Sequence, residues 1–322
     1  MRNYTQNEFS IAEQNQASVW KRFYIYQKER FPILGHGLLV ATFSFSAIAY
    51  SRICRGETGF VSWNTYLIGI FTTITLFLLV RIFDEFKDAK DDAKYRKELP
   101  VPRGLVSLSE LKTLLIIVAA LQIIVNLYFS PKMLMIYFLV IAYLSLMGKE
   151  FFVADWLKKH QFWYVTSHMF IIPLVDIYAS GLDWLLEGVS APFGLVFFFC
   201  VSYMNGIVLE VGRKIRTPQM ESEGVLTYTS MLGIPKAIAL WIGILFVTLC
   251  LSLSASYYAE LGNLAYILLF FVFGICIVPA LLFALKKTKN MAKGVEIASA
   301  FWTICMYLVL GAAPMIQKLI FN

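Results

Sequence analysis

Long apolar runs recur along almost the whole chain and limit the folds that it can adopt. The 322 residues are 59% hydrophobic and only 15% charged, with a mean hydropathy of +0.67. A run of about 18 or more apolar residues is long enough to cross the hydrocarbon core of a bilayer as a helix. The sequence therefore predicts an all-α, polytopic membrane protein with nine transmembrane helices. The expected spans lie near residues 32–50, 64–83, 108–127, 132–150, 162–180, 191–209, 234–254, 261–284 and 296–316.

The polar start of the chain is expected to be a short cytosolic lead-in over residues 1–30. It contains Glu8, Glu13 and several Gln and Asn, and it has no basic start followed by the apolar core of a signal peptide. No Pro- or Gly-rich linker is long enough to divide the rest, so we expect residues 31–322 to form one transmembrane domain. The five cysteines are scattered without a C-x-x-C pair, which favours packing roles over a disulfide framework or a zinc site.

The basic residues behind the formal net charge of +7 are distributed unevenly among the connections. Lys and Arg number 22 in the N-terminal segment and the even-numbered connections, against four on the other side. Because cytoplasmic loops carry the excess of Lys and Arg, this distribution places the even-numbered connections in the cytoplasm. We expect an integral, multi-pass protein of the lipid bilayer, with its charged loops on the cytoplasmic side and no nucleic-acid partner.

Three aspartates are spaced regularly where the second apolar run ends. Asp84, Asp88 and Asp92 are four residues apart, so they share one face about one turn apart if the segment stays helical. Like charges at this spacing repel unless a cation lies against them. Mg²⁺ prefers oxygen ligands and keeps sites open for water or phosphate. The spacing therefore indicates a Mg²⁺ or diphosphate site, and the alternative is a charged juxtamembrane helix with ordinary surface ion pairs.

A second charged loop follows the sixth apolar run. Glu210 stands in the same position relative to its run as Asp84 does, and Lys214 lies one turn beyond it, flanked by Arg213 and Arg216. A carboxylate beside several bases can bridge a metal to a phosphate while the bases hold phosphate oxygens. We expect the two loops to form opposite walls of one cavity mouth. The alternative is a Glu210–Lys214 surface pair flanked by bases that only set the topology.

The first loop and the stretch after it carry a family resemblance. Asp84-Glu85-x-x-Asp88-x-x-x-Asp92, followed by the basic, Pro-containing stretch 96–107, resembles the first aspartate-rich motif of the UbiA superfamily of intramembrane prenyltransferases. The resemblance implies a bundle of nine helices around a central cavity. It also implies an isoprenoid diphosphate as donor, Mg²⁺ as cofactor and a lipophilic acceptor that attacks an allylic cation.

The resemblance assigns roles to individual residues. Asp88 and Asp92 match metal-binding aspartates, whereas Asp84 stands where the family usually has Asn. We expect Asp84, Asp88, Asp92 and Glu210 to hold Mg²⁺ and to be the catalytic residues. The bases expected to bind the diphosphate are Lys97, Arg103, Arg213, Lys214 and Arg216. The second loop departs from the family, because Glu210-x-x-x-Lys214 replaces aspartates at four-residue spacing; either cations have replaced one Mg²⁺ or the diphosphate is bound differently.

Polar and aromatic side chains near the spans are candidates for contact with the acceptor and the cation. Ionisable residues within membrane spans are functional candidates, although a polar side chain can also serve only to bond a neighbouring helix. The candidates for acceptor binding or proton transfer are His168, Asp176, Tyr203 and Asn205. Aromatic faces attract cations, and the residues expected to line a cation pocket, or else an interfacial belt, are Phe151, Phe152, Trp156, Phe162, Trp163, Tyr164 and Tyr203.

The sequence thus favours Mg²⁺-dependent prenyl transfer from an isoprenoid diphosphate to a lipophilic acceptor. Terpene cyclisation, in which an internal alkene replaces the acceptor, needs the same ionisation machinery and remains the alternative. An ion or solute transporter would carry ionisable residues near the midplane of several spans. Here they gather at the cytoplasmic ends instead, which disfavours transport.

Overall fold

The computed structural model describes residues 14–129, 131–221 and 223–321, and every regular element in these ranges is helical. The longer helices are α3 (Ile33–Cys54), α4 (Trp63–Lys87), α6 (Leu108–Phe129), α7 (Met133–Gly148), α10 (Ile171–Trp184), α11 (Leu195–Arg213), α13 (Ile234–Tyr258), α14 (Asn263–Lys286) and α15 (Lys289–Tyr307). The shorter elements are α2 (Val19–Arg30), α5 (Ala89–Tyr95), η1 (Glu150–Phe152), α8 (Ala154–Lys159), α9 (Gln161–Met169), η2 (Pro218–Met220), α12 (Tyr228–Leu232), the π-helical η3 (Leu308–Ala312) and α16 (Ala313–Phe321).

The prediction of an all-α membrane protein is confirmed, but the count of nine spans is not. Within the described residues eight helical segments are long and apolar enough to cross a membrane. The expected span at 132–150 corresponds to α7, an apolar helix of only 16 residues. At 1.5 Å per residue such a helix is about 24 Å long, less than the roughly 30 Å of a typical hydrocarbon core.

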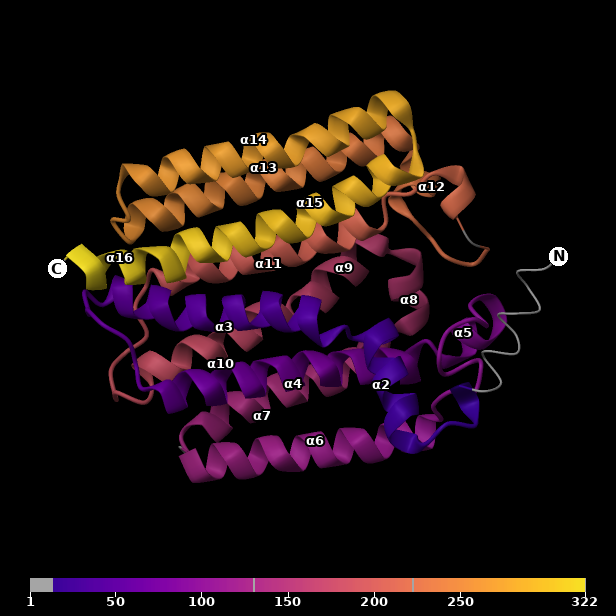
Figure 1. Cartoon of the computed structure of the whole chain (residues 1–322), viewed down its shortest axis with the longest axis horizontal. Helices are drawn as coiled ribbons and strands as arrows, with labels where there is room; N and C mark the ends of the chain where they lie inside the picture. The colour runs from indigo at the N-terminus through magenta and orange to yellow at the C-terminus, as the bar shows by residue number, and fades with distance from the viewer. Residues whose placement is uncertain (1–13, 130, 222, 322) are drawn as a thin grey trace.

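The long helices lie side by side along the long axis of the molecule (Figure 1). Helices α13, α14 and α15 form one side, α4, α6 and α7 the other, and α3, α10 and α11 run between them. The span Gln161–Trp184, which contains α9 and α10, is 67% buried over its apolar window, whereas α6 is only 17% buried. Because α6 also exposes large apolar side chains such as Ile117 and Ile124, it is a peripheral, lipid-facing helix and α10 is a central one.

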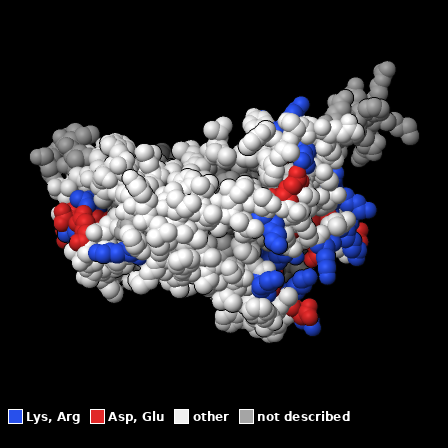
Figure 2. All heavy atoms as spheres, turned by 90° about the horizontal axis from the view of Figure 1, so that it is seen from below, with Lys and Arg blue, Asp and Glu red and all other residues white. Residues whose placement is uncertain are grey.

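On the face shown in Figure 2, charged side chains gather at the two ends of the bundle and leave an uncharged belt between them. We call the end that carries Asp84 the motif end and the end that carries Arg52 the far end. The short helices α5, α8 and α12 all lie at the motif end (Figure 1). Charges restricted to both ends are what a bilayer requires, since a charge at its centre is costly.

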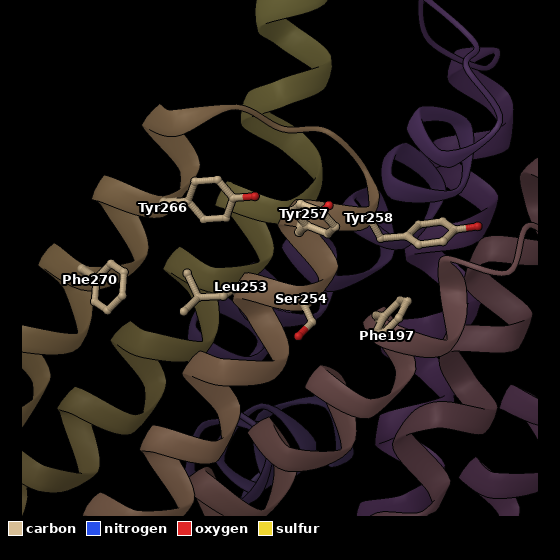
Figure 3. Close-up of a pocket in the computed structure, with 7 residues that line it drawn as sticks. All are labelled: Phe197, Leu253, Ser254, Tyr257, Tyr258, Tyr266 and Phe270. Atoms are coloured by element: carbon tan, nitrogen blue, oxygen red, sulfur yellow. The ribbon is translucent and has the colours of Figure 1, made fainter.

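An open aromatic recess lies at the far end, between the ends of α11, α13 and α14 (Figure 3). Its volume is about 780 Å³ and its lining is almost entirely apolar. The lining residues are Phe197, Leu253, Ser254, Tyr257, Tyr258, Tyr266 and Phe270. None of them belongs to the motif or to the second loop, so the recess is separate from the predicted site.

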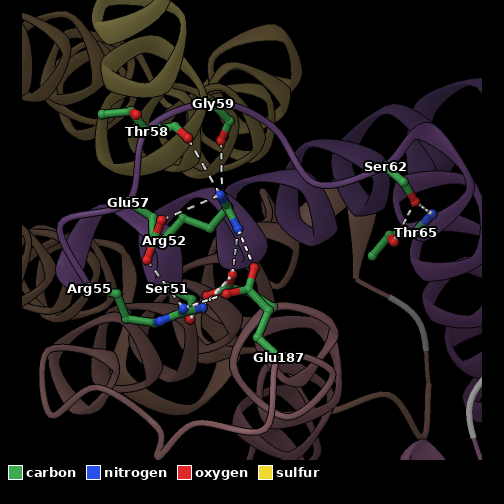
Figure 4. Close-up of polar contacts among 10 residues, drawn as sticks. Ser51, Arg52, Arg55, Glu57, Thr58, Gly59, Ser62, Thr65 and Glu187 are labelled. Atoms are coloured by element: carbon green, nitrogen blue, oxygen red, sulfur yellow. Dashed lines mark hydrogen bonds and ion pairs between the residues drawn. The ribbon is translucent and has the colours of Figure 1, made fainter.

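A network of ion pairs joins α3 to the end of α10 at the far end of the bundle (Figure 4). The carboxylate of Asp183 is fully buried and accepts hydrogen bonds from Arg52 at 3.0 Å, Arg55 at 2.9 Å and Ser51 at 2.7 Å. Glu187 accepts from the same two arginines at 2.8 and 2.5 Å. Each buried charge therefore has a partner, which is the condition under which burial of charge is tolerated.

Replacement of Asp183 by Ala is expected to destabilise the protein by about 3–5 kcal/mol, because two arginines lose the carboxylate that compensates them. Thermal unfolding of the purified protein in detergent measures the effect. Glu57→Ala is the matched control, since this carboxylate is 46% exposed and lies 3.5 and 4.0 Å from the same arginines. Equal midpoints for Asp183→Ala and the wild type would show that the network does not hold the far end together.

Candidate active site

The three aspartates lie where α4 passes into α5. Asp88 ends α4 with φ −89° and ψ 0° and also precedes α5, so the helix axis is interrupted there. The i to i+4 hydrogen bonds nevertheless continue, from Asp88 N to Asp84 O at 2.9 Å and from Asp92 N to Asp88 O at 2.8 Å. The predicted one-turn spacing of the aspartates is therefore kept across the break.

The aspartates differ in their partners. Asp84 is 28% exposed and lies 3.2 Å from Lys87 Nζ, and Asp92 is buried and paired with Arg96. Burial raises the pKa of both Asp88 and Asp92 above the ordinary value. Among the described residues, Asp88 is the aspartate of the motif for which no ion pair within 4.0 Å is found. Asp84 and Asp88 are therefore the carboxylates most open to an external cation.

Glu85, which follows Asp84, has a structural partner instead. Its carboxylate is 1% exposed and accepts hydrogen bonds from Arg30 at 2.5 Å, Arg81 at 3.4 Å and the Tyr26 hydroxyl at 3.5 Å. Arg30 and Tyr26 belong to α2, so Glu85 fastens this helix to α4. The N-terminal lead-in thus carries a helix that is docked against the motif, although its first 13 residues lie outside the described ranges.

The second loop is organised around the buried carboxylate of Glu210. Lys214 donates to it at 2.7 Å, and Arg213 donates at 2.6 Å through Nε and makes a further contact through Nη2. Glu210 is 5% exposed, whereas Arg213 keeps 55% and Lys214 22% of its side chain accessible. Both oxygens of this carboxylate are therefore already hydrogen-bonded within the protein, whereas Arg213 and Lys214 remain accessible to a ligand.

The first motif and the second loop meet at the motif end. Arg213 interacts electrostatically with Asp84 and with Tyr164 of α9, and His168 of α9 interacts with Asp84 and Glu210. Helix α9 packs against α11 and therefore stands between the two loops. That the two charged loops form one cavity mouth stays a prediction.

Lys87 and Glu150 lie within this candidate site, although the sequence did not single them out. Lys87 is 8% exposed; its Nζ donates to the Tyr164 hydroxyl at 2.9 Å and lies 3.8 Å from Glu150 Oε1.

Glu150 and the two residues after it all have positive φ, at 51°, 51° and 61°. Such backbone is costly for residues other than glycine and is found mainly at functional sites. Burial raises the pKa of Glu150. Two features of the sequence could have identified them: Lys87 lies within the aspartate motif, and Glu150 immediately precedes an aromatic run.

His168 is the acceptor candidate that the structure places beside the motif. Its Nδ1 lies 2.8 Å from the Tyr164 carbonyl oxygen and is therefore the protonated nitrogen of the neutral ring. Its Nε2 lies 3.8 Å from Glu150 Oε2, and neither atom has a hydrogen-bond partner in the described structure. Nε2 is consequently a free proton acceptor.

The other acceptor candidates lie deeper or have partners. Asp176 has no accessible surface; its carboxylate oxygens make no hydrogen bond of good geometry in the described structure, although Ser202 interacts with them. Asn205 is 1% exposed and accepts a hydrogen bond from Trp302 at 3.1 Å. The Tyr203 hydroxyl donates to the Thr166 carbonyl at 3.4 Å. A substrate could reach Asp176 or Asn205 only if the surrounding helices moved.

The remaining predicted bases and aromatic residues are spread over the motif end. Arg103 is bound to both carboxylate oxygens of Glu29 at 2.7 and 2.8 Å, Lys97 is exposed, and Arg216 reaches the Met220 carbonyl at 3.5 Å. Of the predicted aromatic set, Tyr164 stacks on His168 and Phe151 meets the same ring edge-on. The exposed members, which match the alternative of an interfacial belt, are Phe152, Trp156, Phe162 and Trp163.

The described residues do not contain a ready-made group of three or more His, Cys, Asp or Glu side chains that could hold a metal. Mg²⁺ does not need one, because it is commonly held by one or two carboxylates together with substrate phosphates. The partly exposed Asp84 and the adjacent Asp88 fit that requirement. Glu210 does not, since both of its oxygens are already engaged by Arg213 and Lys214.

Glu85→Gln is expected to loosen α2 without removing a ligand of the site, because the neutral amide cannot compensate Arg30 and Arg81. Limited proteolysis should cut within residues 14–30 faster than in the wild type, and the unfolding temperature should fall. Glu98→Gln, an exposed change in the same region, serves as control. Unchanged proteolysis of Glu85→Gln would contradict the fastening role.

Comparisons with known proteins identify a family and a fold. The family model described as the UbiA prenyltransferase family matches residues 39–312. No curated protein matches the chain. A UbiA homologue from Aeropyrum pernix K1 has a similar fold, with a TM-score of 0.63, 14% identity and coverage of 88% of this chain and 98% of the homologue. A structure reported for digeranylgeranylglyceryl phosphate synthase gives a TM-score of 0.60 at 15% identity, covering 92% of this chain and 99% of the other.

Proposed function

Because the chain belongs to the UbiA prenyltransferase family, we propose that it transfers a prenyl group from an isoprenoid diphosphate to a lipophilic acceptor within the membrane. One observation carries the proposal: the acidic motif and the accessible cations Arg213 and Lys214 lie at the same end of an apolar bundle, where Arg213 interacts electrostatically with Asp84. Such a site can hold a charged diphosphate at the membrane edge while the bundle accommodates its apolar tail.

The diphosphate is bound between the two loops. Arg213 and Lys214 donate to phosphate oxygens from the second loop. Asp84 and Asp88 would hold Mg²⁺ at the first loop, with Asp92 one turn beyond. A bound Mg²⁺ would supply positive charge beside the leaving pyrophosphate. When the bond between the prenyl C1 and its oxygen breaks, the bonding electron pair leaves with the pyrophosphate.

The prenyl cation and the departing proton then need partners. The stacked rings of Tyr164 and His168 and the edge-on Phe151 lie beside the motif, and an aromatic face such as that of Tyr164 stabilises a nearby cation. The acceptor forms a new bond to C1 and loses a proton, which His168 Nε2 can take because it carries the free lone pair. Glu150, 3.8 Å away, stabilises the imidazolium that results.

The motif end faces the cytoplasm in this proposal. The support is the excess of Lys and Arg in the connections at that end, which is typical of cytoplasmic loops. The donor would then bind from the cytoplasmic side.

Asp88→Asn is expected to lower turnover by about 100-fold, because the amide cannot replace the charge that holds the cation near the leaving group. Pyrophosphate release from geranyl, farnesyl or geranylgeranyl diphosphate is measured with Mg²⁺, with and without a membrane extract as the source of acceptor, followed by mass analysis of the organic phase. Asp91→Asn is the control, since Asp91 lies in the same loop, is 58% exposed and pairs only loosely with Lys158 at 3.4 Å.

Undiminished turnover by a folded Asp88→Asn protein would remove the motif from the reaction. Release that requires the extract and adds a prenyl mass to a lipid supports transfer. Release without any acceptor, accompanied by a cyclic hydrocarbon, would instead favour cyclisation.

A further inference from the structure

We propose that Arg213 and Lys214 take the place of a second metal ion, so that one end of the diphosphate is bound by protein cations alone and a single divalent ion serves the site. This inference rests on the proposed function and specifies how its substrate is held. It assigns Glu210 the role of a positioning residue for two cations, in place of the metal ligand predicted from the sequence.

The first step concerns Glu210. Lys214 occupies Oε1 at 2.7 Å and Arg213 occupies Oε2 at 2.6 Å, and the carboxylate is 5% exposed. A metal ion could bind Glu210 only by displacing one of these cations. Separation of a buried, hydrogen-bonded ion pair is strongly unfavourable. The negative charge of Glu210 is therefore already compensated by two side chains at the position where a metal would have to bind.

The second step concerns the hydrogen-bond donors that remain. Of the three ammonium protons of Lys214, one is used by Glu210, and several guanidinium protons of Arg213 stay free. Two cations against one carboxylate leave a net charge of +1 on this wall, and the cations are 55% and 22% accessible. Accessible donors with excess positive charge match phosphate oxygens.

The third step concerns the opposite wall. Its carboxylates are Asp84, Asp88, Asp92 and Glu150, and among the described residues their ion pairs with Lys or Arg of this wall involve three cations, which are Arg81, Lys87 and Arg96. Arg81 lies 3.9 Å from Asp84 and is shared with Glu85 at 3.4 Å. This wall therefore keeps a net negative charge, which favours binding of a divalent cation. The site is therefore asymmetric, with metal binding on the wall of the first motif and direct phosphate binding on the wall of the second loop.

The test is isothermal titration of the purified full-length protein in detergent with inorganic pyrophosphate, in EDTA and in Mg²⁺. We expect binding in EDTA that Arg213→Gln or Lys214→Gln each weaken by about tenfold or more, the usual effect of losing a charge-assisted hydrogen bond. Lys158→Gln removes an equal charge from a 62% exposed position at the same end and should leave the affinity unchanged. Asp88→Asn should abolish the gain in affinity from Mg²⁺ and keep the binding in EDTA.

Glu210→Gln distinguishes the two roles of Glu210 when binding is measured in Mg²⁺. If Glu210 only holds the cations, its neutralisation leaves their charge available, and pyrophosphate binds at least as tightly as to the wild type both in EDTA and in Mg²⁺. If Glu210 is a metal ligand, the same change weakens binding in Mg²⁺ and would contradict the inference. Counting Mn²⁺ ions bound with pyrophosphate by electron paramagnetic resonance on the wild-type protein gives an independent answer, and we expect one ion per chain.

Two outcomes would overturn the inference. Binding only in the presence of a divalent ion, with two Mn²⁺ per chain, would show that the second loop works through a metal; the proposed prenyl transfer would survive. An absence of pyrophosphate binding under both conditions would overturn the inference and the proposed function together.

Discussion

Pairing of buried charges at the ends of apolar helices is the interaction on which the rest of this structure depends. Glu85 with Arg30, Glu210 with Lys214 and Asp183 with Arg52 each join elements or fix the end of a helix. Between these ends the helices are apolar, and in lipid apolar surfaces discriminate little between alternative helix partners. A buried charge makes the pairing specific, because leaving it unpaired costs several kcal/mol. The ion pairs thus fix which helix ends meet, and the apolar surfaces fill the space between them.

Much of the fold could be predicted from the sequence. Runs of apolar residues gave the all-α membrane class, and a helix is present at each of the nine expected positions. The count of nine spans was not confirmed, because the helix in the run at 132–150 ends at Gly148 and leaves α7 with 16 residues. The break of α9 from α10 at Phe170 also left no clear signal, since apolar residues continue across it.

Only part of the candidate site could be predicted, because a sequence shows spacing along one segment but not which separate segments meet. Spacing along one segment is visible in a sequence, so Asp84, Asp88 and Glu210 were selected. His168 was also selected, as an ionisable residue within a span, but Lys87 and Glu150 were not. The three residues converge from α4, η1 and α9, and η1 contains three consecutive residues with positive φ, which no local preference predicts. Sequence spacing also could not show that Glu210 is engaged by its own neighbours; that depends on the rotamers of Arg213 and Lys214.

The ion-pair network around Asp183 has a consequence for how the bundle can move. Its far end is fastened by two arginines, two carboxylates and Ser51, whereas the motif end is divided into the short helices α5, α8, α9 and α12. The motif end is held by ion pairs as well, among them Glu85–Arg30 and Glu210–Lys214, but these pairs hold a short helix and a helix end rather than two central spans to each other. Short segments open more readily than long packed helices. In the proposed reaction, a bulky lipid would therefore be admitted between the helix ends around the motif, where short helices can shift while α3 and α10 stay joined.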